Sequence, residues 1–361
     1  MPESMPGTTP DAGRAERHRR NPALERLLAE LAADLAPAAA AVHARGGAPR
    51  RPVVLVVGCP RSGTTLLYQW LAAGGGLAYP SNLVSRFFAA PWIGARVHRL
   101  LTDPACDHQG ELTLERPLDP APYRSRLGKT RGLAAPHEFW YWWRRFLPEG
   151  PTHALTPAQE AAVNTAALRA ELAAWEEAAG RPLLLKALIL DWNLPWLARV
   201  LPTALFLHVR RDPLWTMQSL LLARRSHTGR WDRWYSFRPP AYARLRALPP
   251  AEQVAGQVHA TVTGVERGLA AVAPTRWLEI DYGELCRRPA AVHARVRNLL
   301  RAHGEELPPY TGPDSFPERR ERRLPAGLFD RLPRAWQAVT GEPRRPAAPA
   351  APPLREPVPT P

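Results

Sequence analysis

The chain has 361 residues, of which 45% are hydrophobic, and a formal net charge of +15. This length suits one large α/β domain or two ordinary ones, and no run of 18 apolar residues predicts a membrane span. The basic residues are almost all arginines spread along the chain, and no nucleic-acid-binding motif accompanies them, so we expect no nucleic-acid partner.

The two ends of the chain differ in composition from its centre. Residues 1–22 are polar and charged, carry no apolar secretory segment, and are predicted to be disordered. Residues 23–50 form an N-terminal helical segment, whose apolar pattern over 23–44 is predicted to break at Pro37. Residues 341–361 are mostly proline and alanine, which predicts a disordered tail. The three cysteines are far apart in a chain without an export signal, which favours reduced thiols in a cytoplasmic protein.

Strands alternate with helices over residues 51–340, which we interpret as the functional domain. Short apolar runs predict strands at 53–57, within 181–190, at 204–209 and at 275–280. Helical patterns cover 65–73 and 156–179, the latter with Thr156 as N-cap and Pro157 at the first helical position. The alternation predicts a three-layer α/β fold with a central, mainly parallel sheet of about four or five strands flanked by helices.

A glycine-containing loop joins the first strand to its helix. This phosphate loop, residues 58–65, has the sequence Gly-Cys-Pro-Arg-Ser-Gly-Thr-Thr. Such a loop directs backbone N–H groups and the positive end of a helix at one point, which suits a phosphate. Its spacing is close to the Walker A pattern, but Thr64 occupies the lysine position, which argues against a kinase or ATPase. The residues predicted to bind a cofactor here are Pro60, Arg61, Ser62, Gly63, Thr64 and Thr65.

A second anion site is predicted after the strand at 204–209. The sequence continues Arg-Arg-Asp-Pro, with Asp212 as an N-cap and Pro213 at the first helical position. Arg211 therefore lies at a strand end beside a helix N-terminus, and Ser219 lies about two turns into that helix. The guanidinium and the hydroxyl can bind one anion together.

The two motifs together resemble those of sulfotransferases that use 3′-phosphoadenosine 5′-phosphosulfate (PAPS). The phosphate loop resembles their 5′-phosphosulfate loop, and Arg-x-Pro with a serine eight residues after the arginine resembles their 3′-phosphate motif. The resemblance covers about residues 51–300. It implies a P-loop NTPase-like fold, PAPS as sulfuryl donor, no catalytic metal, and transfer to a hydroxyl or amine of a small-molecule or glycan-like acceptor. The family's late Arg-Lys-Gly loop is absent, and the charged run at 318–323 is either its replacement or a solvated surface segment.

Sulfuryl transfer requires a base for the acceptor and cations for the charge that develops on the leaving oxygen. Arg61 and Lys186 are the candidate cations. Lys186 is one of only two lysines, with Lys129, and it ends a predicted strand at a position where several sulfotransferase branches carry a lysine.

The base is sought in the segment PHEFWYWWRR at 136–145. In the tyrosylprotein branch a glutamate lies about twenty residues past the loop, where this chain has Ser81 and Asn82, and neither is a base. Glu138 is the favoured base and His137 the second choice, because aromatic neighbours are expected to raise a carboxyl pKa toward neutrality. The alternative is a core aromatic helix whose polar residues face water. Two other functions stay open: a P-loop nucleotide kinase, and a nucleotide-binding homologue without catalytic activity.

Overall fold

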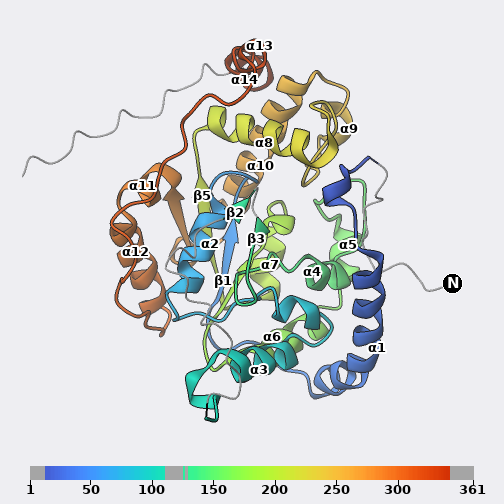
Figure 1. The fold of residues 1–361 in the computed structure, drawn as a ribbon, viewed down its shortest axis with the longest axis vertical. Coiled ribbons are helices and arrows are strands. Elements are labelled where there is room, and N and C mark those ends of the chain that lie inside the picture. The colour runs from blue at the N-terminus through green and yellow to red at the C-terminus, as the bar shows by residue number, and fades with distance from the viewer. Residues whose placement is uncertain (1–12, 110–124, 127–128, 342–361) are drawn as a thin grey trace, which may run out of the picture.

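A four-stranded parallel sheet forms the centre of the computed structural model, which describes residues 13–109, 125–126 and 129–341 (Figure 1). The strand order is β4-β1-β5-β6, with bounds β1 (Val53–Val57), β4 (Leu183–Lys186), β5 (Ala204–Arg210) and β6 (Trp277–Asp281). Helices flank this sheet, so the predicted three-layer parallel fold is confirmed. The central β1 pairs with β4 and β5, which places Val56 opposite both Lys186 and Leu207.

Both faces of β1 are buried, which explains its unbroken apolar sequence. Val54 and Val56 pack in a cluster with side chains of the first helix after β1 and of the helices at 282–301. Leu55 and Val57 face the other cluster, which contains the tryptophans of the 140–143 segment. The sheet therefore separates two hydrophobic cores.

Helices precede, connect and follow the strands of the central sheet. In chain order they are α1 (Pro22–Arg45), α2 (Thr64–Ala73), α3 (Pro91–Thr102), α4 (Trp140–Phe146), α5 (Pro157–Ala162), α6 (Thr165–Ala179), α7 (Leu194–Val200), α8 (Pro213–Thr228), α9 (Tyr242–Leu245), α10 (Pro250–Ala270), α11 (Tyr282–Arg287), α12 (Pro289–Arg301), α13 (Ala326–Phe329) and α14 (Leu332–Thr340). Short 3-10 turns are η1 (Glu16–His18), η2 (Val84–Phe87), η3 (Pro104–Cys106), η4 (Leu188–Leu190) and η5 (Pro274–Arg276). A small antiparallel pair is formed by β2 (Ser125–Arg126) and β3 (Lys129–Thr130).

The helix α1 continues through Pro37, so the predicted break there is wrong. Proline removes one helical hydrogen bond, but Pro37 is exposed, and water can bind the carbonyl that is left. By length and composition this helix could cross a membrane. In the structure it is tied to the domain, since Tyr141 donates a hydrogen bond to Glu25 and His43 contacts Glu171.

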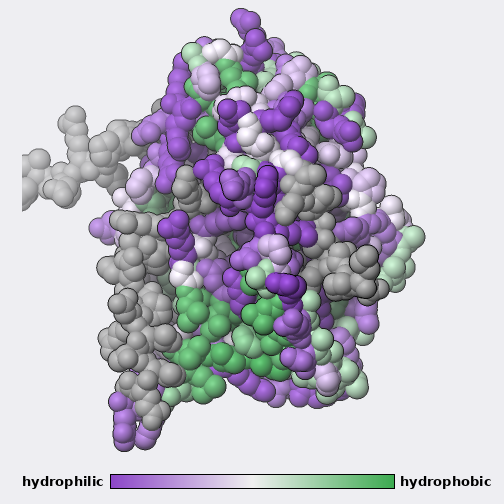
Figure 2. All heavy atoms as spheres, turned by 45° about the vertical axis from the view of Figure 1, so that its right-hand side comes forward, coloured by the Kyte–Doolittle hydropathy of each residue, from purple (hydrophilic) through white to green (hydrophobic). Residues whose placement is uncertain are grey.

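Figure 2 shows hydrophilic residues over most of the upper part of one face and hydrophobic residues gathered below.

The helical pattern at 156–179 is divided into α5 and α6, whereas the sequence predicted one helix. Thr156 is the predicted N-cap of α5 and forms a capping box with Gln159. Asn164 accepts a hydrogen bond from the Ala167 N–H and so begins a second helix. The division follows because asparagine caps helices better than it continues them.

Part of the N-terminal segment predicted to be disordered is folded against α8. The Ala15 N–H donates to the His227 carbonyl over 2.7 Å, and Arg17 donates to the Ser226 hydroxyl over 2.8 Å. The rings of His18 and His227 stack with centroids 3.9 Å apart. Residues 13–21 therefore form a wall of the domain, while residues 1–12 and the tail from 342 lie outside the described residues.

Candidate active site

The carboxyl ends of the four parallel strands meet at one edge of the sheet, where ligands bind in open α/β folds. The phosphate loop follows β1, Lys186 ends β4, Arg211 follows β5 and Tyr282 follows β6. A cleft of about 3060 Å³ opens over this edge. Among the described residues it is lined by twelve arginines, both lysines and only four glutamates, with no aspartate. Such an excess of positive charge suits a large anionic ligand.

Backbone geometry limits which residues the phosphate loop accepts. Gly63 has φ +107°, and a Cβ there would lie 2.3 Å from the Tyr282 ring. Gly58 has φ +126°, and a Cβ there would lie 2.7 Å from the Val209 carbonyl. Arg61 adopts φ +75°, a conformation that costs energy for a residue with a side chain and is found mostly at functional sites. The loop is thus held in a tight conformation that brings its backbone close to β5 and α11.

A buried acid that the sequence analysis missed holds the start of the phosphate loop by a hydrogen bond. Asp191 is fully buried and accepts a hydrogen bond from the Gly58 N–H over 3.0 Å. Burial raises its pKa well above the ordinary value, and the Gly58 hydrogen bond only partly opposes this. An aspartate inside the apolar run ALILDW was the signal available in the sequence. Within the described part of the chain the buried Ser62 hydroxyl has no hydrogen-bond partner, so it can serve a ligand.

Lys186 contacts two other predicted site residues, Thr65 and Glu138. Its ammonium donates to the Thr65 hydroxyl over 2.9 Å and to the Glu138 carboxylate over 2.5 Å. The Lys186 side chain is 4% exposed, whereas that of Glu138 is 31% exposed. The indole N–H of Trp140 donates to the other Glu138 oxygen over 2.6 Å. The carboxylate is therefore held by two donors and still open to the cleft.

The pKa of Glu138 is lowered, contrary to our prediction from its aromatic neighbours. Burial raises this pKa, but the charge of Lys186 and the hydrogen bonds from Lys186 and Trp140 outweigh it. Burial lowers the pKa of His137 to about 4, so its ring is neutral near pH 7. The His137 Nδ1 accepts the Phe139 N–H over 3.0 Å, which leaves the ring proton on Nε2. Neither nitrogen of this ring is then available to take a proton, whereas Glu138 is an ionised acceptor.

The second predicted anion site is joined to the phosphate loop. Arg61 donates through Nε to the Ser219 hydroxyl over 3.1 Å, and Arg211 donates to the Arg61 carbonyl over 3.2 Å. The Arg211 guanidinium lies over the Tyr282 ring, 4.5 Å from its centroid. Burial lowers the pKa of both arginines, and the charge of Arg61 lowers that of Arg211 further. Two repelling guanidinium groups held together favour an anion between them.

The charged run at 318–323 is attached to this site through its backbone. Arg211 donates to the Arg319 carbonyl over 2.6 Å. The Gln218 side chain donates to the Glu321 carbonyl and accepts from the Arg323 N–H, over 2.9 and 2.8 Å. The run is therefore not a free surface segment, although the side chains of Arg319 and Arg323 are exposed and line the cleft.

The aromatic segment contributes side chains to both the core and the cleft wall. Trp142 and Trp143 are fully buried and donate their indole N–H groups to Glu171 and to the Lys186 carbonyl. Trp140 faces the cleft and stacks on Phe237 with ring centroids 4.7 Å apart. This pair forms an apolar wall beside Glu138.

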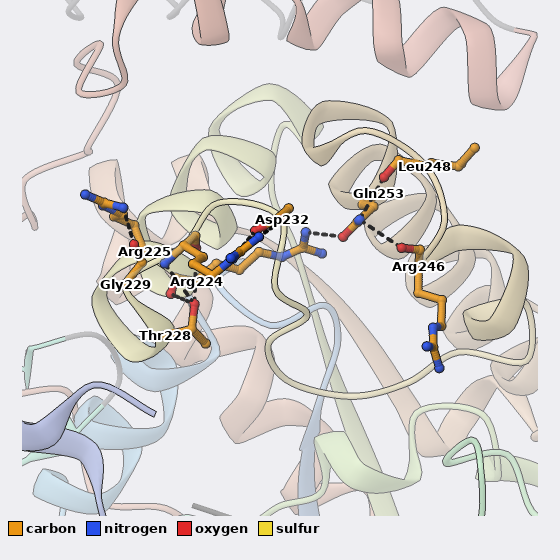
Figure 3. A network of polar contacts seen from close by, with 9 residues as sticks. Arg224, Arg225, Thr228, Gly229, Asp232, Arg246, Leu248 and Gln253 are labelled. Atoms are coloured by element: carbon orange, nitrogen blue, oxygen red, sulfur yellow. Dashed lines mark hydrogen bonds and ion pairs between the residues drawn. The ribbon is translucent and has the colours of Figure 1, made fainter. Parts of the chain in front are cut away.

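A buried arginine holds the loop that carries this wall. Figure 3 shows Arg224 of α8 directed at Gln253 of α10, to which it donates over 2.7 Å. Its second nitrogen donates to Gln257 over 3.0 Å, and the Gln257 amide donates to the Tyr235 and Phe237 carbonyls. Burial lowers the pKa of Arg224 to about 9. The network fixes the backbone of the 235–237 segment, which lines the cleft.

The parallel sheet with a loop-and-helix anion site at its carboxyl edge defines a P-loop-like α/β protein. A sequence profile described as the sulfotransferase family matches residues 52–309, and the chain belongs to that family. No curated protein matches the chain. The chain is similar to the crystal structure of sulfotransferase STF9 from Mycobacterium avium, with a TM-score of 0.50, 18% identity, and coverage of 93% of this chain and 80% of that one. It is also similar to sulfotransferase STF1 from Mycobacterium tuberculosis H37Rv, with a TM-score of 0.48, 15% identity, and coverage of 80% and 78%.

Proposed function

We propose that this chain transfers a sulfuryl group from PAPS to a hydroxyl or amine of a small-molecule or glycan-like acceptor. The observation that carries the proposal is the position of Lys186, whose ammonium joins Thr65 of the phosphate loop to the carboxylate of Glu138. Lys186 thereby lies within hydrogen-bonding distance of both the proposed donor-binding loop and the proposed base, an arrangement that suits group transfer.

Two anion sites divide the donor between them in this proposal. The N–H groups at the start of α2 have no partner within the helix, and they would bind the 5′-phosphosulfate together with the hydroxyls of Thr64 and Thr65. Arg211 and Ser219 would bind the 3′-phosphate, and the 318–323 run would replace the family's late loop. The buried Ser62 hydroxyl without a partner among the described residues fits this assignment, as does the contact between Arg61 and Ser219.

In the transfer, Glu138 takes the proton from the acceptor. The acceptor oxygen or nitrogen forms a bond to sulfur while the bond from sulfur to the 5′-phosphate oxygen breaks, which yields the sulfated acceptor and adenosine 3′,5′-bisphosphate. Lys186 and Arg61 stabilise the charge on the departing phosphate, an effect of about 3 kcal/mol for one preorganised donor. The structure contains no group of three His, Cys, Asp or Glu side chains placed to hold a metal within its described residues. We propose, as the resemblance to PAPS-dependent sulfotransferases implies, that the reaction proceeds without a metal, and that it takes place in the cytoplasm.

The backbone explains how Glu138 would replace the base of the tyrosylprotein branch. Ser81 pairs with Pro136 in an antiparallel bridge, and the His137 N–H donates to the Pro80 carbonyl over 2.7 Å. The segment that precedes Glu138 thus lies beside the position where that branch has its glutamate. A carboxylate delivered from the neighbouring segment can serve the same place.

The proposal is tested by incubating the protein with labelled PAPS and a panel of hydroxyl and amine acceptors, with EDTA present. We expect a labelled sulfated product, and tight binding of adenosine 3′,5′-bisphosphate by calorimetry. Binding without any product would identify an inactive homologue. Binding of ATP with Mg²⁺ in preference to the bisphosphate would refute the donor assignment.

A further inference from the structure

A second group of arginines lines the cleft apart from the two donor sites. Its members, which we call the acceptor-side arginines, are Arg14, Arg20, Arg144 and Arg238. They come from the N-terminal segment, from α4 and from the loop after α8. The charged groups that act on Arg144 are Glu149, Arg20, Arg14 and Arg238, whereas Arg61 is affected by Tyr235, Glu138, Arg319 and Tyr282. Arg144 and Arg61 thus have different charged neighbours.

Arg144 lies close enough to the other three acceptor-side arginines for their charges to act on it. Burial lowers the pKa of Arg144, and Arg20, Arg14 and Arg238 lower it further, with Glu149 acting in the opposite direction. Like charges held together are unfavourable unless a ligand of opposite charge binds between them.

These arginines are fixed in place and are not a solvated charge run. The Arg238 guanidinium donates to the Gly150 carbonyl over 2.7 Å, and the Arg238 backbone N–H donates to His153 Nδ1 over 3.0 Å. The segment carrying Arg14 and Arg20 is attached to α8 through the Ala15 N–H. A group of cations preorganised in this way binds an anion with little loss of conformational freedom.

Trp140 connects the acceptor-side arginines to the base. Its indole N–H holds Glu138, its ring stacks on Phe237, and the Arg144 guanidinium lies 5.5 Å from its ring centroid. A molecule lying along this wall with its hydroxyl at Glu138 would place its other end near the arginines.

We infer that the acceptor-side arginines form a subsite for an anionic group of the acceptor. The acceptor is then a hydroxyl compound that also carries a carboxylate or a phosphate, held with its apolar body against Trp140 and Phe237. This inference rests on the proposed function, because it takes Glu138 as the position of the reacting hydroxyl.

Calorimetry on the complex with adenosine 3′,5′-bisphosphate tests the subsite with three matched probes. These are 4-hydroxyphenylacetate, 4-hydroxybenzylphosphonate and the neutral 4-hydroxyphenethyl alcohol. We expect both anions to bind at least about tenfold more tightly than the alcohol, the change that one charge-assisted hydrogen bond supports. Comparing the affinities of the carboxylate and the phosphonate probes shows which anion the subsite prefers.

Substitutions of single arginines test whether the acceptor-side arginines cause the preference for anionic probes. Arg144→Gln should remove most of the preference for the anions, and Arg144→Lys should restore part of it, while bisphosphate binding stays unchanged. Arg26→Gln removes a cation on the exposed face of α1 and should leave the preference intact. Arg238→Gln provides a second variant if Arg144→Gln does not fold.

The outcomes separate the two proposals. If wild-type protein does not bind the bisphosphate, the donor assignment fails. If it binds the bisphosphate but all three probes bind equally or not at all, the anionic subsite is refuted and the donor assignment stands. A preference for anions that survives both arginine substitutions also refutes the subsite.

Discussion

Replacement of Glu138 by glutamine tests the proposed chemistry most directly. The carboxylate accepts from Lys186 over 2.5 Å and from Trp140 over 2.6 Å, and burial alone does not neutralise it because Lys186 lowers its pKa. Glutamine keeps the shape but has one acceptor oxygen and cannot take a proton. A positioned base contributes about 10²–10⁴-fold in rate, which corresponds to roughly 3–5 kcal/mol of transition-state stabilisation.

The assay measures kcat with labelled PAPS and bisphosphate binding by calorimetry. We expect Glu138→Gln to lower kcat by about 10²–10⁴-fold while bisphosphate affinity changes much less. Glu149→Gln is the matched control, because Glu149 is a glutamate of the same cleft with no ion pair to Lys186. A thermal melt establishes that both variants are folded. A kcat for Glu138→Gln close to that of the control would show that another residue is the base.

Four further outcomes follow from the site. Arg211→Ala should weaken bisphosphate binding by about 10–100-fold, measured by calorimetry, because it removes a charge-assisted contact; unchanged affinity would contradict the 3′-phosphate assignment. Gly63→Ala should destabilise the fold by about 1–3 kcal/mol in urea unfolding, and by more than Gly180→Ala, since Gly180 also has positive φ but open space around it. Arg224→Met should cost about 2–4 kcal/mol in the same assay and raise the acceptor KM, because the loop loses its anchor; an unchanged KM would contradict that role. Because the pKa of Glu138 is lowered, kcat/KM should stay level as pH falls from 8 to about 5 and decline only near or below the usual carboxyl pKa of about 4.3. The stability that the ion pair adds is likewise lost as pH falls through the lowered pKa, and a decline in rate near pH 7 would contradict this assignment.

The sequence predicted the strands and the helix that begins after Asp212 because these are local patterns. An apolar run such as Val53–Val57 and a cap such as Asp212 depend on residues next to them in the chain. The pKa of Glu138 was predicted to be raised, whereas it is lowered. The prediction failed because the partner Lys186 is 48 residues away, and nothing in the sequence spacing shows that the two side chains meet. Asp191 was missed for the same reason, since its role depends on the Gly58 N–H of the phosphate loop, 133 residues away in the chain.

The position of Lys186 explains how the loop functions without a lysine of its own at Thr64. The ammonium reaches the loop from β4, the strand beside β1, and not from the start of α2. In the proposed function, this one cation on a rigid strand would contact both the donor-binding loop and the base. The chain uses arginine almost everywhere else, but a planar guanidinium is larger than an ammonium. The gap between the Thr65 hydroxyl and the Glu138 carboxylate, with contacts of 2.9 and 2.5 Å, is suited to a compact point charge. In the proposed function, the arginines around the cleft would bind extended anions, whereas Lys186 lies where one nitrogen contacts two partners.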